Sequence, residues 1–269
     1  MKCKNTNRRE HDAFVKYHGP HLAEDHARAQ HWWAICEMVE GLNAPRPISL
    51  DPSRGEIAYE WMDGLHRMLL PAKGATQRVE QLGRLLARVH AESRSASTDL
   101  VDSAPPYMPE HLGLPAGKAE VLRHHFPTVF FHGDCWHGNV FWRDDGSFVM
   151  LDPIPNPWLF DRSRWRACAA IDLAMMHMSL FLCHSALAHL LRGMGAYHQL
   201  AESLLSGYSA AGGASGADWK RPLLSLSRII AKRHVSAYRQ RLARPVATLK
   251  TGIGRRVVGK LDGEIAWNR

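Results

Sequence analysis

One short stretch, FFHGDCWHGNVFWRDDGSFVMLD from Phe130 to Asp152, contains three polar side chains that could together transfer a proton and bind a metal ion. Asp134 and Asn139 stand five residues apart, and Asp152 follows Asn139 by thirteen residues at the end of an apolar run. One carboxylate of such a set can accept the proton of a hydroxyl, while an amide oxygen and a second carboxylate are ligands that suit Mg²⁺. Bound Mg²⁺ in turn holds phosphate, so the set fits a site where nucleotide phosphates complete the metal shell.

Short apolar runs separated by turn residues place this stretch on a hairpin of strand, loop and strand. The runs TVFF, VFW and SFVMLD predict strands, HGDCWHGN a loop and RDDG a turn. We therefore expect Asp134 and Asn139 in the loop and Asp152 at the end of a strand.

The first sixty residues predict a small unit of strand, helix and strand. DAFVKYHG, from Asp12 to Gly19, predicts a strand that contains Lys16, and GEIAYEWMDG, from Gly55 to Gly64, predicts another that ends in a D-G turn. Between them, a stretch rich in His and Trp predicts a helix to about Leu42.

The rest of the chain is predicted to be mainly helical. One stripe of the segment that starts at Thr76 is apolar and predicts a core helix, with Val79, Leu82, Leu85, Leu86 and Val89 on that stripe. The apolar span from Ile171 to Leu191 contains Asp172 and three histidines, which favours a buried helix over a membrane span.

The composition is that of a globular chain. With 269 residues, 45% apolar and 22% charged, it suits one large domain or two small ones. The polar start lacks a secretory signal, which predicts a cytoplasmic location, and five scattered cysteines without a C-x-x-C pair argue against a disulfide framework. The charge of +8 is concentrated from Lys220 onward, where we interpret it as the solvated face of a helix, with a nucleic-acid or lipid surface as the alternative.

The strings HGDCWHGN and VMLDP resemble the catalytic and metal-binding loops of the aminoglycoside phosphotransferase family of protein-kinase-like enzymes, which includes fructosamine kinases. LGRLLARVHA resembles the family's first large-lobe helix, and APRPI followed by IAYEWMDG resembles its run into the interlobe hinge. The resemblance implies an α+β, bilobal protein-kinase-like fold with a shortened N-terminal β lobe, residues 1–62, and a mainly helical C-terminal lobe, residues 63–269.

The resemblance also implies roles for the residues of the loop and its surroundings. Asp134 corresponds to the catalytic base, and Asn139 and Asp152 correspond to the metal ligands. His132 corresponds to the structural histidine of the loop, and Asp172 to an acid that ties a helix to the loop by hydrogen bonds.

For the nucleotide, the resemblance points to the first lobe. Lys16 is similar to the phosphate-binding strand lysine, and Glu24 is the candidate for its helix partner, with Glu37 as the alternative. Adenine would be received by backbone groups of three hinge residues, Glu60, Trp61 and Met62.

These roles describe an ATP- and Mg²⁺-dependent phosphotransferase that acts on the hydroxyl of a small molecule such as an antibiotic, a sugar or an amino alcohol. Its partners would be the nucleotide and that small molecule, without a membrane span and without nucleic acid. Only fifteen residues precede Lys16, none of them glycine, where the family has two strands and a glycine-rich phosphate loop. The alternative is therefore a pseudokinase-like module that binds a small molecule or a protein without transfer.

Other readings of the same region remain open. His132, Asp134, Cys135 and His137 are all potential zinc ligands, although residues so crowded in one loop cannot easily converge on one ion. Cys135 could act as a nucleophile only if a base lay beside it. Downstream, three arginines could engage an anionic acceptor or phosphate or be solvated, namely Arg162, Arg164 and Arg166.

Overall fold

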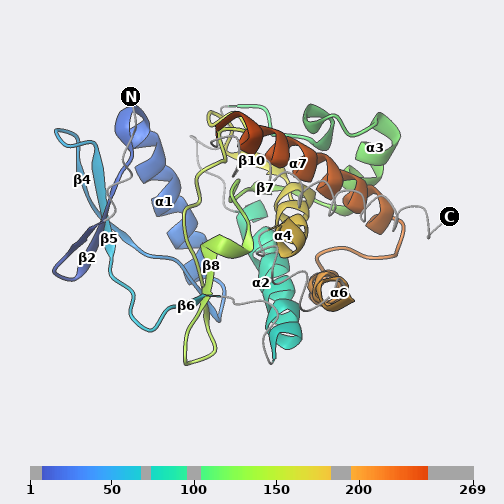
Figure 1. Ribbon diagram of the computed structural model, residues 1–269, viewed down its shortest axis with the longest axis horizontal. Helices are drawn as coiled ribbons and strands as arrows, with labels where there is room; N and C mark the ends of the chain where they lie inside the picture. Colours follow the sequence, from blue (N-terminus) through green and yellow to red (C-terminus); the bar gives the residue numbers. More distant parts are fainter. Residues whose placement is uncertain (1–7, 68–73, 96–103, 183–194, 242–269) are drawn as a thin grey trace.

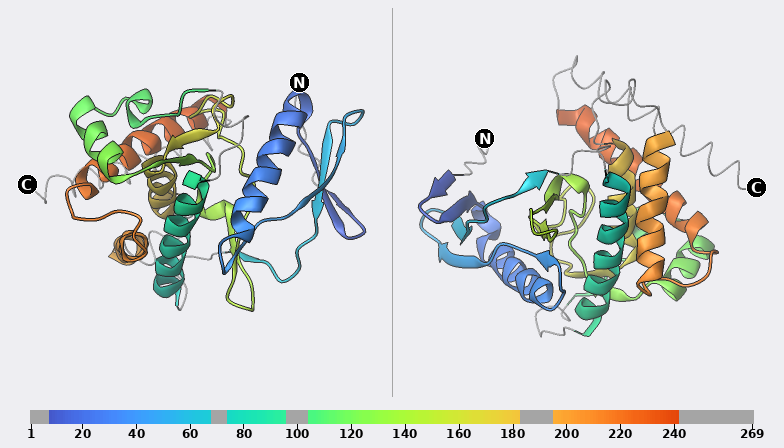
Figure 2. Two further views of the ribbon diagram at one scale, coloured as in Figure 1. Left: turned by 180° about the vertical axis from the view of Figure 1, so that it is seen from behind. Right: turned by 90° about the horizontal axis from the view of Figure 1, so that it is seen from below.

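The structure, a computed structural model, describes residues 8–67, 74–95, 104–182 and 195–241. Figure 1 shows two parts side by side, one rich in strands and the other built mainly of helices. The view from below in Figure 2 shows the same order, with a small sheet between the two parts. This is the α+β fold class that the sequence predicts.

The strand-rich part is a four-stranded antiparallel sheet in the order β1-β2-β5-β4. Its strands are β1 (Arg8–Glu10), β2 (Ala13–Tyr17), β4 (Pro47–Asp51) and β5 (Glu56–Glu60). Both predicted strands, β2 and β5, are therefore confirmed. Lys16 lies opposite Ile57 in the sheet.

Helix α1 (Leu22–Glu37) packs against this sheet after the short 3-10 helix η1 (Gly19–His21). Leu22 and Ala29 of the helix form a small core with Ile57 and Tyr59 of β5. The helix ends at Glu37, earlier than the predicted end near Leu42, because the chain leaves it to form strand β3 (Leu42–Asn43).

A second sheet, in the order β3-β9-β8-β6, joins the two parts. It contains β6 (His66–Arg67), β8 (Val140–Trp142) and β9 (Phe148–Met150). Strands β8 and β9 form the predicted hairpin, β3 runs parallel to β9, and β6 runs antiparallel to β8. A third, two-stranded sheet pairs β7 (Thr128–Phe130) with β10 (Arg166–Cys168).

The helical part surrounds the main hydrophobic core. Its elements are α2 (Ala75–Ser95), η2 (Pro109–Leu112), α3 (Ala116–His125), α4 (Ala170–Leu182), α6 (Gly195–Ala210) and α7 (Lys220–Arg241). The predicted apolar stripe of α2 is fully buried, which confirms it as a core helix. Helix α6 packs so closely on α2 that a Cβ at Gly207 would overlap the carbonyl oxygen of Glu80.

Helix α7 has the amphipathic character that the sequence predicts. Leu223, Leu226 and Ile230 are buried, whereas Arg221 and Lys232 are exposed to solvent. None of the described helices is long and apolar enough to cross a membrane. Residues 183–191 of the long apolar span lie outside the described part of the chain.

Candidate active site

The predicted catalytic loop connects β7 to β8 and presents Asp134 between two amide side chains. Asn139 donates from Nδ2 to Oδ2 of Asp134 over 3.0 Å, and Asn156 donates from Nδ2 to Oδ1 over 3.2 Å. Asn139 also donates to the main-chain oxygen of Asp134, which closes the loop. The two amides fix the direction in which the carboxylate faces.

The surroundings of Asp134 alter its acidity. Burial raises the pKa of its carboxyl to about 6, against the two amide donors, which favour the charged form. The carboxylate of Asp152 raises this pKa further, and Lys16 lowers it. A carboxyl that titrates near neutral pH is a better proton acceptor than an ordinary aspartate and is still ionised at neutral pH.

Asp172 of α4 holds the first turn of the loop. Its Oδ2 accepts the backbone N–H of His132 over 2.7 Å, and its Oδ1 accepts that of Gly133 over 3.0 Å. His132 accepts the N–H of Asp134 through Nδ1. Burial lowers the pKa of His132 to about 4 although Asp172 opposes this, so the ring is neutral and its Nδ1 remains an acceptor. These contacts support the structural roles predicted for both residues.

Glycine is required at position 133 by a close approach of the backbone. Gly133 has a φ of +76°, and a Cβ there would lie 2.7 Å from Cα of Pro155. Its carbonyl accepts the N–H of Asn156 over 3.0 Å. This close packing brings the Asn156 side chain to Asp134. Asn156 was not predicted from the sequence, because no motif distinguishes it from other loop asparagines.

Asp152 follows β9 and forms an ion pair with Lys16 of β2. Lys16 Nζ lies 2.5 Å from Asp152 Oδ1, and the side chains are 14% and 44% exposed, respectively. Asp152 has a left-handed backbone with a φ of +58° directly before Pro153, where extended backbone is the rule. Strain of this kind persists where neighbouring contacts fix it and is frequent at functional sites.

Asn139 and Asp152 border the same cavity and are linked through the hairpin. The N–H of Leu151, next to Asp152, donates to the main-chain oxygen of Asn139 over 2.9 Å. Because the amide nitrogen of Asn139 donates to Asp134, its amide oxygen is the atom left for a cation. An amide oxygen and a carboxylate fit Mg²⁺, which needs few protein ligands because it keeps several waters.

The alternative readings of the loop find no support. Among the described residues, no group of three His, Cys, Asp or Glu side chains is placed to hold a metal ion. Cys135 is buried, and burial raises the pKa of its thiol well above the usual value, so it stays protonated. A protonated thiol is a poor nucleophile.

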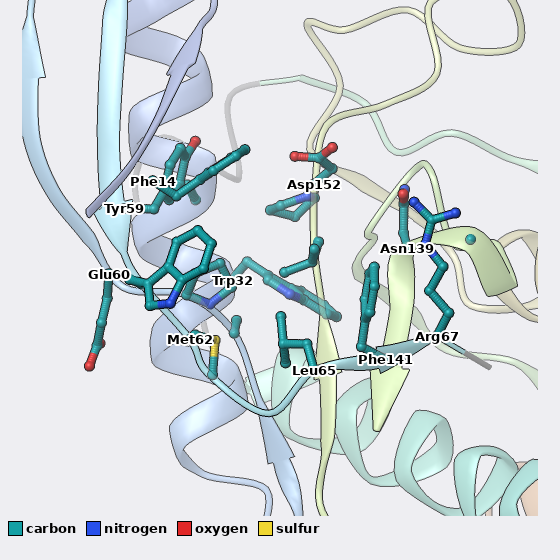
Figure 3. Close-up of a pocket in the computed structure, with 17 residues that line it drawn as sticks. Phe14, Trp32, Tyr59, Glu60, Met62, Leu65, Arg67, Asn139, Phe141 and Asp152 are labelled. Carbon is teal, nitrogen blue, oxygen red and sulfur yellow. The ribbon is translucent and has the colours of Figure 1, made fainter. Parts of the chain in front are cut away.

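A cavity of about 420 Å³ opens between the strand-rich part and the β8–β9 hairpin, within the size range of small-molecule sites. Figure 3 shows Phe14 and Tyr59 on the side of the first sheet and Phe141 on the side of the hairpin. Asp152 and Asn139 lie at the polar side of the same space. The cavity therefore offers apolar walls for a flat ring and oxygen ligands next to them.

The predicted hinge residues border this cavity. The side chain of Glu60 points away from it in Figure 3, so only its backbone can take part. The backbone N–H of Glu60 donates to the main-chain oxygen of Arg46 over 2.8 Å. That of Trp61 donates to the main-chain oxygen of Asp12 over 2.9 Å. The N–H of Met62 donates to none of the described residues. Met62 is thus the predicted hinge position whose N–H has no partner among the described residues.

Arg67 of β6 also borders the cavity and was missed by the sequence analysis. Figure 3 shows its side chain extending toward that of Asn139. Arg67 is exposed and forms no ion pair within the described part of the chain. Its position depends on the pairing of β6 with β8, in which Arg67 lies opposite Phe141. A two-residue strand of this kind has no sequence pattern, so no signal could have found it.

Glu24 does not occupy the predicted position beside Lys16. Its carboxylate lies 3.8 Å from Nδ1 of His21, whereas Lys16 contacts Asp152. Glu37, the alternative, is exposed at the last residue of α1. The structure thus pairs Lys16 with a different carboxylate from the one predicted.

The neighbouring residue Asp25 links α1 to the segment that follows Asp152. His18 Nδ1 lies 2.9 Å from one oxygen of Asp25, and Nη2 of Arg162 lies within 2.6 Å of both oxygens. Burial raises the pKa of Asp25, but these two partners outweigh it and lower the pKa below the usual value. Arg162 is therefore engaged by Asp25 through Nη2, and its side chain is partly exposed. The guanidinium of Arg164 lies over the ring of Tyr107.

Sequence comparison finds distant kinase relatives. No protein-family model matches the chain. Stress response kinase A of Salmonella typhi and the serine/threonine protein kinase RdoA of Salmonella typhimurium are each 25% identical to it, over 53% of this chain and 52% of the relative. The chain thus spans about half the length of the curated relatives it matches.

Similar solved structures are kinases that act on small molecules. A glucosamine kinase in complex with glucosamine, ADP and inorganic phosphate has a TM-score of 0.58 at 17% identity, covering 93% of this chain and 72% of that one. A choline/ethanolamine kinase family protein from Mesorhizobium loti has a TM-score of 0.58 at 14% identity, covering 96% of this chain and 87% of that one. An amicoumacin kinase in complex with AMP-PNP, Ca²⁺ and Ami has a TM-score of 0.54 at 12% identity, covering 96% of this chain and 88% of that one. The chain therefore has the protein-kinase-like fold of these small-molecule kinases.

Proposed function

We propose that this chain, which has the fold of small-molecule kinases, is an ATP- and Mg²⁺-dependent phosphotransferase that acts on a hydroxyl group. The observation that carries the proposal is the placement of three predicted residues. Asp134 is oriented by two amides, and one of those amides, Asn139, borders the same cavity as Asp152. In this proposal, Asn139 and Asp152 would be oxygen ligands at the edge of a space large enough for a nucleotide ring, and Asp134, hydrogen-bonded to Asn139, would be the proton acceptor next to them.

Adenine would lie between the apolar walls of the cavity, with its edge toward the hinge. The N–H of Met62 would donate to a ring nitrogen, and the carbonyl of Glu60 would accept from the amino group. Asn139 and Asp152 would hold Mg²⁺, which would supply positive charge to the phosphates when bound. The ammonium of Lys16, 2.5 Å from Asp152, would contribute further charge at the same place.

Transfer would need little covalent chemistry from the protein. Asp134 would orient the acceptor hydroxyl and take its proton as the hydroxyl oxygen bonds to the γ-phosphorus and the bond to the β-phosphate oxygen breaks, which releases ADP. Lys16 would stabilise the negative charge of the transferring group. Catalysis would rest on positioning and electrostatics, which is why the hydrogen bonds that orient Asp134 matter.

The acceptor would be a small molecule with a hydroxyl group, of the sugar, amino alcohol or antibiotic type. The names of the similar structures include glucosamine, choline, amicoumacin and aminopropanol kinases, and these support that range. One of the curated relatives is a serine/threonine protein kinase, so a protein hydroxyl belongs among the acceptors to be tested.

Nucleotide binding can be tested by thermal shift with MgATP. We expect a clear rise in melting temperature for the unmodified chain, because a ligand that binds only the folded state stabilises it. The rise should vanish in Asp152→Ala and persist in Asp218→Ala, which removes an exposed carboxylate outside the cavity. No rise for the unmodified chain at millimolar nucleotide would contradict the proposal and favour the module that binds without transfer.

Transfer can be tested with ATP labelled at the γ-phosphate against a panel of sugars, amino alcohols, antibiotics and an unfolded protein rich in serine and threonine. We expect labelled product from at least one small-molecule class, and a loss of roughly a hundredfold or more in Asp134→Asn, as is typical when a general base is removed. Transfer that continues unchanged in this variant would rule out Asp134 as the base.

A further inference from the structure

Arg28, on the second turn of α1, is a buried charge that neither the motif nor the nucleotide accounts for. Its side chain is 1% exposed, among the lowest values for a charged residue in the described chain. The guanidinium donates from Nη2 to the carbonyl of Phe131 over 2.9 Å and from Nε to that of Pro153 over 3.0 Å. A longer contact of 3.4 Å joins Nη1 to the carbonyl of Arg164.

Aromatic rings enclose the same guanidinium. Its carbon lies 4.9, 5.5 and 5.3 Å from the ring centres of Phe130, Phe131 and Trp165, a range in which a cation is attracted to the ring face. Burial lowers the pKa of Arg28 to about 9, and the carboxylate of Glu24, one turn earlier, favours the charged form. The side chain therefore remains a cation at neutral pH.

The two shorter hydrogen bonds of Arg28 join the two halves of the active site. Phe131 directly precedes His132, so its carbonyl fixes the start of the loop that carries Asp134. Pro153 directly follows Asp152, so its carbonyl fixes the strained backbone at the proposed metal ligand. One planar group with several donors in a fixed fork can hold both carbonyls at once, whereas a lysine ammonium acts as a point charge.

We infer that Arg28 is a positioning residue that sets the place of Asp134 relative to Asp152 from the first lobe. The inference rests on the proposed function and extends it, because it gives α1 a connection to the active site other than a carboxylate beside Lys16. Arg28 touches neither the cavity nor the reacting atoms, so its removal should change the alignment for transfer rather than the nucleotide pocket.

The test compares Arg28→Lys and Arg28→Met with the unmodified chain, well below the melting temperature of each protein. We expect kcat to fall by roughly tenfold to a hundredfold, since small displacements at a reacting centre have effects of that size, while KM for ATP changes by less than about threefold. Arg78→Lys is the matched control, because Arg78 also lies over an aromatic ring, Trp142, but makes no described hydrogen bond to the site.

The outcomes separate this inference from the proposed function. If the unmodified chain transfers no phosphate, the proposed function fails, whatever the variants do. If it is active and the folded Arg28 variants keep their kcat, or lose nucleotide affinity as much as kcat, only the inference about Arg28 fails. Two variants that both fail to fold would make Arg28 a determinant of folding and would overturn the positioning role as well.

Discussion

Lys16 and Asp152 are 136 positions apart in the chain and form a direct ion pair, with Nζ 2.5 Å from Oδ1. This contact links the second strand of the first sheet to the end of the catalytic hairpin. It places a cation where the proposed function needs one for phosphate. It also means that the carboxylate proposed to bind Mg²⁺ has a partner before any ligand arrives.

The role of this ion pair can be tested with Lys16→Met, which keeps the length of the side chain and removes its charge. A hydrogen bond to a charged group contributes about 1.5 to 3 kcal/mol, so we expect affinity for MgATP to fall by roughly tenfold to a hundredfold. Calorimetric titration measures the affinity of each variant for MgATP. Lys118→Met is the control, because Lys118 bonds Ser225 outside the cavity. Equal affinity in the two variants would argue against a phosphate role for Lys16.

The pH dependence of transfer should follow the ionisation of Asp134. Only the charged carboxylate can accept a proton, and burial raises the pKa of this group to about 6. We therefore expect kcat to be level above about pH 7 and to fall about tenfold per pH unit well below pH 6. Any residual transfer by Asp134→Asn should not show this fall of kcat at low pH. A level kcat down to about pH 5 in the unmodified chain would contradict the assignment.

The same raised pKa predicts a change in stability. Below about pH 4 Asp134 is protonated in both the folded and the unfolded chain, whereas above pH 6 the folded chain must lose a proton that it holds more tightly. Stability from this group is thus present at low pH and lost as pH rises through about 6. Asp134→Asn removes the effect, so its melting temperature relative to the unmodified chain should rise with pH.

The expected difference in stability between Asp134→Asn and the unmodified chain follows from the pKa shift of Asp134. A rise in pKa from 3.8 to about 6 corresponds to an upper limit of about 3 kcal/mol in the free energy of unfolding. Melting curves between about pH 4 and pH 7.5 measure it, and ionisable groups common to both proteins cancel in the comparison. A melting-temperature difference that does not depend on pH would show that the Asp134 pKa is not raised.

Arg67 is expected to bind phosphate rather than the adenine ring. It is an exposed cation at the cavity beside Asn139, so a polyphosphate is the ligand group that its charge favours. Arg67→Gln should therefore lower the affinity for ATP and ADP by roughly tenfold, the effect of losing one charge-assisted hydrogen bond. The affinity for adenosine should be nearly unchanged.

Affinities for ATP, ADP, AMP and adenosine, measured in parallel, separate the possible contacts of Arg67. Arg143→Gln makes the same change of charge on the turn of the hairpin, outside the cavity, and should leave all four affinities as they are. A loss of adenosine affinity equal to the loss for ATP would place Arg67 on the ribose or the ring instead.

The site residues that could be predicted from the sequence are those whose positions follow from local spacing along the chain. Asp134 and Asn139 lie in the loop between β7 and β8, and Asp152 follows β9 closely, so their separation along the chain nearly determines which elements carry them. Lys16 was found in the same way, as a lysine inside a short apolar strand. The core stripe of α2 follows directly from helical periodicity.

The remaining parts depend on contacts between distant segments. In α1, Glu24 and Asp25 are adjacent and chemically alike, yet only Asp25 is buried against Arg162. The helix has no clean apolar stripe to reveal which residue faces inward. Arg28 was missed for a related reason, because an arginine in a helix is normally expected at the surface. Strands of two residues, such as β3, arise only from tertiary pairing.

The strand β3 has a mechanical consequence. Main-chain pairing joins the strand-rich part to the catalytic hairpin at two places, where β3 pairs with β9 and where β6 pairs with β8. The Lys16–Asp152 ion pair and the hydrogen bond from Arg28 to the carbonyl of Pro153 add side-chain links. A ligand that enters the cavity therefore lies between segments tied to each other at several separate points rather than by a free linker.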